Sequence, residues 1–142
     1  MNITKISAHI TFEEATVSPT ALRLGINNEP NEAELTAMRL VAELCFEPLR
    51  KWYDKPIKVN SFFRCSELNT AVKGAKNSQH TLGEAIDLTG GSKDENKKLF
   101  DWAKDNLDYD QLLWEFGDDT GPDWVHISYK RSGNRKQIVV VK

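Results

Sequence analysis

The sequence predicts an α+β fold, in which a small antiparallel sheet is covered by two to three helices. Residues 31–52 and 92–106 carry apolar side chains every three or four positions, which is the spacing of a helix with one buried face. Several shorter segments alternate apolar and polar residues or are rich in β-branched residues, as strands are. A chain of 142 residues also has the size of one domain with one core, so residues 1–142 are expected to form a single domain.

The bulk composition excludes several classes of protein. Hydrophobic residues make up 39% of the chain and charged residues 28%, as in a folded domain and unlike a disordered one. The net charge of −2 gives no overall attraction to nucleic acid or to anionic membranes, so neither is an expected partner. No apolar run approaches the roughly 18 residues that cross a bilayer, and residues 1–6 lack the apolar stretch of a secretory signal. We expect a monomer that is synthesised in the cytoplasm and does not insert into membranes.

Residues 1–30 are predicted to form an extended N-terminal arm. They contain one short apolar alternation and then many turn-forming residues, ending in Asn27-Asn28-Glu29-Pro30. A short helix near residues 19–24 is the regular element expected in this arm.

The first long helix is predicted to begin after Asn31. Asn31 and Glu34 have the spacing of a capping box, in which each residue's side chain bonds the other's backbone N–H. Pro48 lies inside the helical pattern and lacks an N–H, so it should kink the helix or end its regular part. Cys45 falls on the apolar stripe, and we expect it and Cys65 to be free thiols in a reducing compartment. The stripe consists of Leu35, Met38, Ala42, Cys45, Leu49 and Trp52.

A strand and a short helix follow. Residues 56–63 alternate apolar and polar side chains and are predicted to form the strand. Ser66 is expected to cap a helix at residues 67–73, which Gly74 ends.

The C-terminal half is predicted to contain one helix and three strands. Ser92 and Glu95 have the spacing of a second capping box. The helix after them should cover the sheet with Leu99, Trp102, Ala103 and Asn106. Strands are expected at residues 111–116, 124–129 and 137–141, with a loop at 117–122 and a turn at 132–134. The first of these strands should point Leu112, Trp114 and Phe116 to one face and Gln111, Leu113 and Glu115 to the other.

Three residues are candidates for a metal site. His80 and Asp87 lie seven residues apart, and His126 lies far downstream. Asp87 belongs to a predicted strand at residues 85–88, on the face opposite Ile86. Imidazole nitrogen and carboxylate oxygen are ordinary ligands of Zn²⁺, and a catalytic zinc site uses three protein ligands and leaves one position to water. Spacing alone leaves open the alternative of a hydrogen-bonded His–Asp pair, and His9 has no motif around it.

A longer pattern connects these residues. Ser78-x-His80-x-x-Gly83-x-Ala85-x-Asp87, followed by Trp124-Val125-His126, resembles the zinc-binding signature of the M15 peptidases. This family of D-Ala-D-Ala carboxypeptidases and phage endolysins shares its core fold with hedgehog signalling domains. The likeness extends over most of the chain and includes Phe12-Glu13-Glu14-Ala15, Pro48-Leu49-Arg50, residues 56–61, Arg64, Glu67-Leu68-Asn69 and residues 111–117.

The resemblance implies that His80, Asp87 and His126 bind Zn²⁺. It also implies a metallopeptidase that hydrolyses peptide bonds in peptidoglycan stem peptides or cross-links. Such a protein would be a phage or prophage endolysin or a cell-wall peptidase, and would act on the wall after release from a bacterial cell. A non-catalytic zinc domain that binds wall peptide or a protein partner is the alternative, and a virion structural component is a third possibility.

Two carboxylates are candidates for the base that hydrolysis requires. Glu115 lies on the polar face of a strand that is expected to pair with the strand of His126 through the loop at 117–122. Asp123 lies three residues before His126, where many M15 enzymes carry their acidic base, but strand parity turns it to the other side unless a bulge intervenes. We rank Glu115 first. The alternatives are a structural salt bridge for Glu115 and a turn-forming role for Asp123.

The remaining candidates are Arg64, Ser78 and Gln79. The family uses the arginine matching Arg64 to bind substrate, and its planar fork suits a carboxylate or carbonyl; the alternative is an exposed ion pair. Ser78 and Gln79 could bind substrate or hold the metal ligands in place. Ser61-Phe62-Phe63-Arg64 departs from the family's usual Ser-Gly-Tyr-Arg, so the extra phenyl group is expected either to narrow the cleft or to fill the core.

Overall fold

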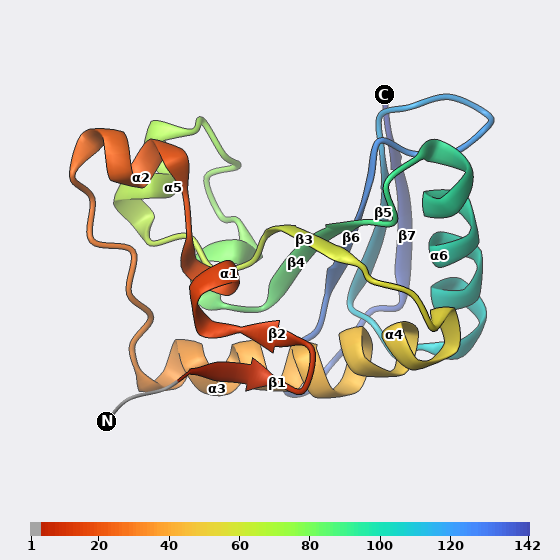
Figure 1. Ribbon diagram of the computed structural model, residues 1–142, viewed down its shortest axis with the longest axis horizontal. Helices are drawn as coiled ribbons and strands as arrows, with labels where there is room; N and C mark the ends of the chain where they lie inside the picture. Colours follow the sequence, from red (N-terminus) through yellow and green to blue (C-terminus); the bar gives the residue numbers. More distant parts are fainter. Residues whose placement is uncertain (1–3) are drawn as a thin grey trace.

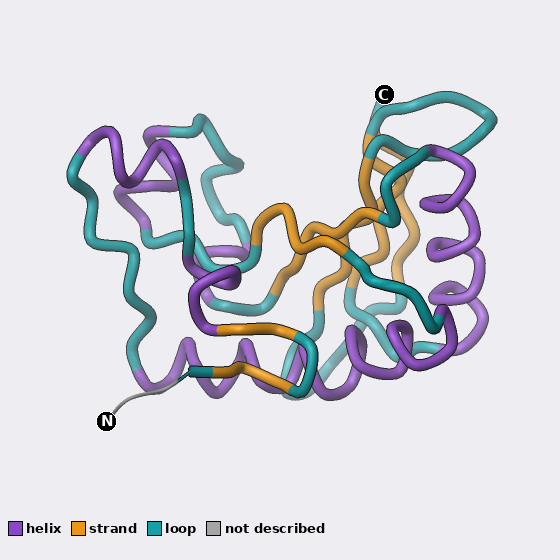
Figure 2. The backbone as a smooth tube through the Cα atoms, in the orientation of Figure 1, coloured by secondary structure: helices purple, strands orange, loops and turns teal. Residues whose placement is uncertain are grey.

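The computed structural model describes residues 4–142, and its elements are shown in Figures 1 and 2. The strands are β1 (Lys5–Ser7), β2 (Ile10–Thr11), β3 (Lys58–Ser61), β4 (Ala85–Thr89), β5 (Gln111–Glu115), β6 (Trp124–Ser128) and β7 (Gln137–Val141). The helices are α1 (Phe12–Thr16), α2 (Pro19–Leu24), α3 (Glu32–Val41), α4 (Glu47–Tyr53), α5 (Ser66–Ala71) and α6 (Lys93–Asn106). A π-helical turn, η1 (Ala42–Phe46), and a 3-10 turn, η2 (Gln79–Leu82), complete the set. The predicted α+β class is confirmed. The prediction that residues 1–6 lack a secretory signal falls in part on residues 1–3, which lie outside the described residues.

The main sheet has five strands in the order β3-β4-β6-β5-β7. All neighbouring pairs are antiparallel except β5 and β7, which run parallel with Gln111 opposite Gln137. The prediction of an antiparallel sheet is therefore wrong at this edge. The reason lies in the chain after β6, which returns to the start of β5: the Asp110 carboxylate accepts from Arg135 N–H and Nε–H at 3.0 Å, and the Gln137 N–H donates to the Asp110 carbonyl at 2.9 Å.

The long helices pack on one face of this sheet. In Figure 1, α3, η1 and α4 follow one another along the bottom and α6 stands at the right. The stripe on the first helical run is buried from Leu35 to Leu49, as predicted, but Trp52 is 45% exposed and stacks on Trp102 of α6 instead. Pro48 lies in the first turn of α4, in a helical run that is continuous from α3 through η1, and the π-helical turn directly before it interrupts the regular α-helix, as predicted.

The N-terminal segment is not an extended arm. β1 and β2 pair with each other, and Ile6 and Ile10 are buried in the core. Thr11 and Glu14 form a capping box that opens α1, which the sequence analysis did not predict. The predicted helix at residues 19–24 is present as α2. The short apolar alternation was the signal of this packing, because isoleucines in a solvated arm would have nothing to bury them.

Two helix caps differ from prediction. α5 begins at Ser66, and the cap is Cys65, whose Sγ accepts from the Leu68 N–H at 3.5 Å. Ser92 caps α6 by accepting from the Glu95 N–H, but the Glu95 carboxylate does not return the bond. It accepts instead from Tyr53 Oη, Lys55 Nζ and Lys98 Nζ, which ties α4 to α6.

Two side chains lie off their predicted faces. Asn106 is exposed, and Asn96, Leu99, Phe100 and Ala103 form the buried face of α6. Phe116 follows β5 in a left-handed conformation with φ 57°, which ends the alternation and packs its ring against Trp124. Both cysteines are free thiols, as predicted. Among residues 4–142, no helix has the length and hydrophobicity needed to span a bilayer.

Candidate metal centre

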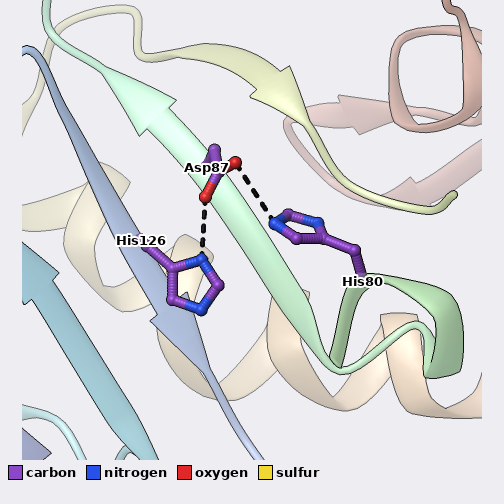
Figure 3. A group of neighbouring side chains, drawn as sticks. All are labelled: His80, Asp87 and His126. Carbon is purple, nitrogen blue, oxygen red and sulfur yellow. Dashed lines mark hydrogen bonds and ion pairs between the residues drawn. The ribbon is translucent and has the colours of Figure 1, made fainter. Parts of the chain in front are cut away.

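The pairing of β4 with β6 brings Asp87 and His126 together. The two residues are register partners in adjacent antiparallel strands, so their side chains point to the same face of the sheet. Asp87 Oδ1 lies 2.9 Å from His126 Nδ1 (Figure 3). Ile86 and Leu88, which flank Asp87, are fully buried on the opposite face, as the alternation predicts. Burial of Ile86 and Leu88 under the helices therefore fixes the register of β4, and this register places Asp87 opposite His126 on the other face of the sheet.

The turn η2 supplies His80 to the same point. The Ser78 hydroxyl caps this turn by accepting from the His80 N–H at 3.1 Å. Gly83 ends the turn with φ 75°, and a Cβ at this position would lie 2.5 Å from the Glu34 carbonyl oxygen of α3. Only glycine combines this left-handed turn with so close an approach to α3. Glycine here allows the chain to leave His80 and enter β4 within a few residues.

The His80 ring is held in one orientation by the main chain. Its Nδ1 donates to the Phe62 carbonyl at 2.7 Å, so Nε2 is the nitrogen that faces Asp87 Oδ2, 3.2 Å away. Nε2 and this carboxylate oxygen therefore point into the same space, where a bound cation can replace the proton between them. Phe62 itself is 1% exposed, so the phenyl group that departs from the family pattern fills the core and not the cleft.

One ligand atom from each of His80, Asp87 and His126 lies within 4.8 Å of the other two. The set of two imidazoles and one carboxylate matches the donors of catalytic zinc sites. His80 is 2% exposed, and burial alone would raise the pKa of Asp87. Hydrogen bonds and charge from His126 and His80 outweigh that effect and hold the pKa of Asp87 well below its usual range. The carboxylate is therefore ionised and available as a ligand.

Glu115 lies on the same face of the sheet as His126. β5 pairs with β6 in continuous register, with Leu113 opposite His126 and Glu115 opposite Trp124, so Glu115 is the diagonal neighbour of His126. Burial raises the pKa of Glu115, and the charge of Asp87 acts in the same direction, whereas His126 and His80 lower it. Glu115 therefore lies on the face of the sheet that carries Asp87 and His126.

Asp123 occupies a different position. It is exposed and precedes β6, and its N–H donates to the Glu115 carbonyl at 2.9 Å. The pairing of β5 with β6 is continuous and contains no bulge. Nothing in this register therefore turns the Asp123 side chain to the face of the sheet that carries His126. Of the two candidate bases, Glu115 is the one whose strand position shares the face of His126.

Arg64 is half-buried, and its N–H donates to the His80 carbonyl at 3.2 Å. Burial lowers the pKa of Arg64, and the nearby charge of Asp87 acts against this. Among the described residues its Nε is buried without a hydrogen-bond partner, and none of the ion pairs found there includes Arg64. Gln79 Nε2 contacts Glu84 Oε1 at 3.3 Å.

Asn28 is a site residue that the sequence analysis missed. It is 8% exposed, and its amide donates to the carbonyls of Thr16 and Phe63 and accepts from the Cys65 N–H. These bonds fix the backbone on both sides of Arg64. In the sequence Asn28 lies among turn formers before Pro30, and nothing in that composition distinguishes a buried amide from an exposed one.

Two comparisons with known proteins bear on this site. A family model described as Peptidase M15 matches residues 8–128, which contain every candidate site residue. A stretch of 40 residues, 28% of the chain, is 52% identical to the zinc D-Ala-D-Ala carboxypeptidase of Streptomyces albus G. That match covers 16% of the carboxypeptidase, so the chain spans only a small part of this relative's length.

Proposed function

Because this chain belongs to the M15 peptidase family, we propose that it is a zinc peptidase that hydrolyses peptide bonds in peptidoglycan stem peptides or cross-links. The family and the carboxypeptidase relative both support a zinc peptidase. The observation that carries the proposal is the convergence of His80, Asp87 and His126, whose ligand atoms lie within 4.8 Å of one another.

These three residues would hold the zinc ion. His80 would bind through Nε2, since Nδ1 is committed to the Phe62 carbonyl, and His126 through Nδ1, the nitrogen that faces Asp87. A zinc ion held by two neutral imidazoles and one carboxylate keeps a net positive charge, which acidifies water and polarises a peptide carbonyl.

The surrounding residues would complete the reaction. We assign the base to Glu115, whose carboxylate would accept a proton from the attacking water and return it to the leaving amine. A raised pKa suits a carboxyl group that must both take and give a proton near neutral pH. Asp123 is the second candidate for this role. Arg64 would bind a carboxylate or carbonyl of the substrate, and Ser78 would hold the turn that carries His80.

The relative is named a D-Ala-D-Ala carboxypeptidase, and we extend this peptide substrate to the present chain by proposing a cell-wall target. An endolysin or wall peptidase is the form of this activity that we propose, acting as a monomer on the wall after release from a bacterial cell. Binding of wall peptide by a non-catalytic zinc domain is the competing function, and only a measurement of turnover separates the two.

The test is digestion of purified muropeptides, read by mass spectrometry. Protein loaded with zinc should release defined peptide fragments, chelation should abolish the release, and added zinc should restore it. Glu115→Gln should bind zinc as the native protein does and release fragments about 10²–10⁴-fold more slowly, whereas Asp123→Asn should retain activity if Glu115 is the base. Zinc binding without any fragment release would overturn the enzymatic proposal in favour of the binding domain.

A further inference from the structure

The strand β7 forms an open edge of the main sheet. Among residues 4–142 it pairs with β5 alone, and its five residues contain no proline, charged side chain or bulge. Proteins usually protect an edge strand with one of these devices, because its unpaired N–H and C=O groups can pair with another strand. The Gln137 N–H and the Val141 carbonyl both bond residues that flank β5, so the odd-numbered residues of β7 turn their polar groups toward β5. The polar groups of Ile138 and Val140 therefore point away from the sheet.

Apolar rows of the helix-covered face end at this edge in exposed side chains. Two rows run in register across β6, β5 and β7: Val125, Trp114 and Val140 in one, and Ile127, Leu112 and Ile138 in the next. The members on β6 are fully buried, whereas Ile138 and Val140 are 41% and 55% exposed. Apolar side chains that continue the core onto an open strand edge mark a site of association with another chain.

The chemistry of β7 fits a second copy of the same strand. If two copies of β7 run antiparallel and centre on Val139, Ile138 of one copy lies opposite Val140 of the other. These are the two residues whose polar groups point outward, so each such pair can exchange both of its N–H···O bonds. Their side chains also become cross-strand neighbours, so each apolar row continues into the second copy.

The charges at the ends of β7 complement this arrangement. Antiparallel pairing brings Lys136 of one copy to the end of β7 at which the other copy carries Lys142. That end borders a pocket of about 510 Å³, lined in part by Asp118, Asp119 and Lys142. Within residues 4–142, Asp119 belongs to none of the ion pairs, and Lys136 belongs to one, with Asp108 at 4.0 Å. The incoming lysine therefore brings positive charge to a carboxylate that lacks an ion-pair partner in the described chain.

We propose that β7 pairs with β7 of a second copy, antiparallel and centred on Val139, in a symmetric dimer with one continuous sheet. The contact uses one five-residue strand from each copy and is small beside the roughly 1,200–2,000 Å² of a standard interface, so the dimer is weak. The monomer that we propose as the active form predominates at low concentration, and the dimer forms as the protein accumulates. The two-fold axis is perpendicular to the sheet, so both candidate metal centres open on the same side of it. Neither the pairing nor its test requires zinc or catalysis.

Sedimentation of the full chain tests the dimer. Native protein should pass from monomer to dimer as its concentration rises from micromolar to millimolar, and exchange of the Ile138 and Val140 amide protons should slow over the same range. Val140→Lys places a charge in both symmetric pairs, so it should raise the dissociation constant by about tenfold or more. Val17→Lys is the matched control: Val17 is also 55% exposed but lies outside the sheet, so this variant should dimerise as the native protein does.

A disulfide tests the register. Val139 lies opposite its own copy in a pair without hydrogen bonds, where Cα atoms are about 4.5 Å apart, within the range of a disulfide. Val139→Cys should therefore form a covalent dimer on mild oxidation. The background is Cys65→Ser, which removes the half-buried free thiol and keeps an oxygen to cap α5. Gln137→Cys is the control, because Gln137 lies opposite Val141 of the second copy and should cross-link far less.

The outcomes are distinct from those of the muropeptide digest. A native protein that stays monomeric at millimolar concentration overturns the dimer, including the case in which an added extended peptide occupies β7 instead. A dimer that Val140→Lys leaves unchanged, or equal cross-linking of Gln137→Cys and Val139→Cys, overturns this pairing. If Val140→Lys fails to fold, the two cysteine variants decide. Selective cross-linking through Val139→Cys supports the pairing whether or not muropeptides are cleaved.

Discussion

Asp87 and His126 face each other across two central strands of the sheet, with Asp87 Oδ1 2.9 Å from His126 Nδ1 and Asp87 Oδ2 3.2 Å from His80 Nε2. One carboxylate therefore contacts both imidazoles, one through each oxygen. Loss of its negative charge should leave two imidazoles without an anionic partner, and the site would hold a divalent cation poorly.

Asp87→Asn should consequently lower zinc affinity by more than the roughly 100-fold that loss of an outer-sphere partner can cost. The amide keeps the shape of the side chain, so the fold should persist. Competition with a chelating dye measures the affinity. Asp101→Asn, on the exposed surface of α6, is the control and should bind zinc as the native protein does. Equal affinities for the two variants would contradict the metal assignment.

Gly83→Ala should destabilise the protein and weaken zinc binding together. The new Cβ would lie 2.5 Å from the Glu34 carbonyl oxygen in addition to the strain of φ 75°. Gly133 has the same φ of 75° and open space around it, so Gly133→Ala carries only the backbone strain, about 1–2 kcal/mol. Urea denaturation should show the larger loss for Gly83→Ala, and only this variant should bind zinc less tightly. If Gly83→Ala lost no more unfolding free energy than Gly133→Ala, α3 would have to move away from the new methyl group at little cost.

These two residues illustrate what the sequence could predict. Asp87 was predictable because alternation with the apolar Ile86 gives its face, and Gly83 because the motif places glycine between two ligands. The hydrogen bond from His80 to the Phe62 carbonyl could not be predicted, since any residue type can supply a backbone acceptor. The parallel edge strand β7 was also beyond prediction: its composition indicates a strand, but its partner depends on how Asp110 captures the returning chain.

Burial of the N-terminal segment was missed for a related reason. Ile6 and Ile10 form too short a pattern to outweigh the turn formers after them, although both are buried. Trp52 shows the opposite error. It has the right spacing for the core, but α4 ends near it, and stacking on Trp102 at the surface satisfies the ring. Periodicity gives the face of a helix and not the depth of the core beneath it.

Asn28→Ala should cost about 3 kcal/mol or more of unfolding free energy, because it leaves two carbonyls and one N–H without their partner, each worth roughly 1–3 kcal/mol when buried. Asn28→Asp keeps the acceptor for the Cys65 N–H but loses both donations, so it should also be destabilising. Asn106→Ala, at an exposed amide on α6, should change stability little. Urea denaturation of the three variants measures the differences, and a small loss for Asn28→Ala would show that water replaces the amide.

Acid should weaken the attachment of β7. Hydrogen bonds from Arg135 lower the pKa of Asp110 to about 2, against the effect of burial. A carboxyl group with a lower pKa in the folded state stabilises the fold above its unfolded pKa of about 3.9, and this contribution is lost as the pH falls toward 2. Asp110→Asn should thus be less stable than the native protein at pH 6, with the gap narrowing between pH 4 and pH 2. A gap that is constant over this range would exclude the ion pair as its source.

Glu115 should respond to zinc if it lies beside the metal. Without metal, its pKa is above the ordinary value because burial disfavours the charged form and Asp87 repels it, despite the opposing imidazoles. A cation held by His80, Asp87 and His126 adds positive charge to the site, so the pKa of Glu115 should fall on zinc loading. Titration of ¹³C-labelled glutamate carboxyls by NMR measures this, and Glu115→Gln assigns the resonance. The same variant should lower kcat on muropeptides by about 10²–10⁴-fold, the usual contribution of a general base. A Glu115 resonance indifferent to zinc would transfer the role to Asp123, because a base that acts on water at the metal must feel the charge of that metal.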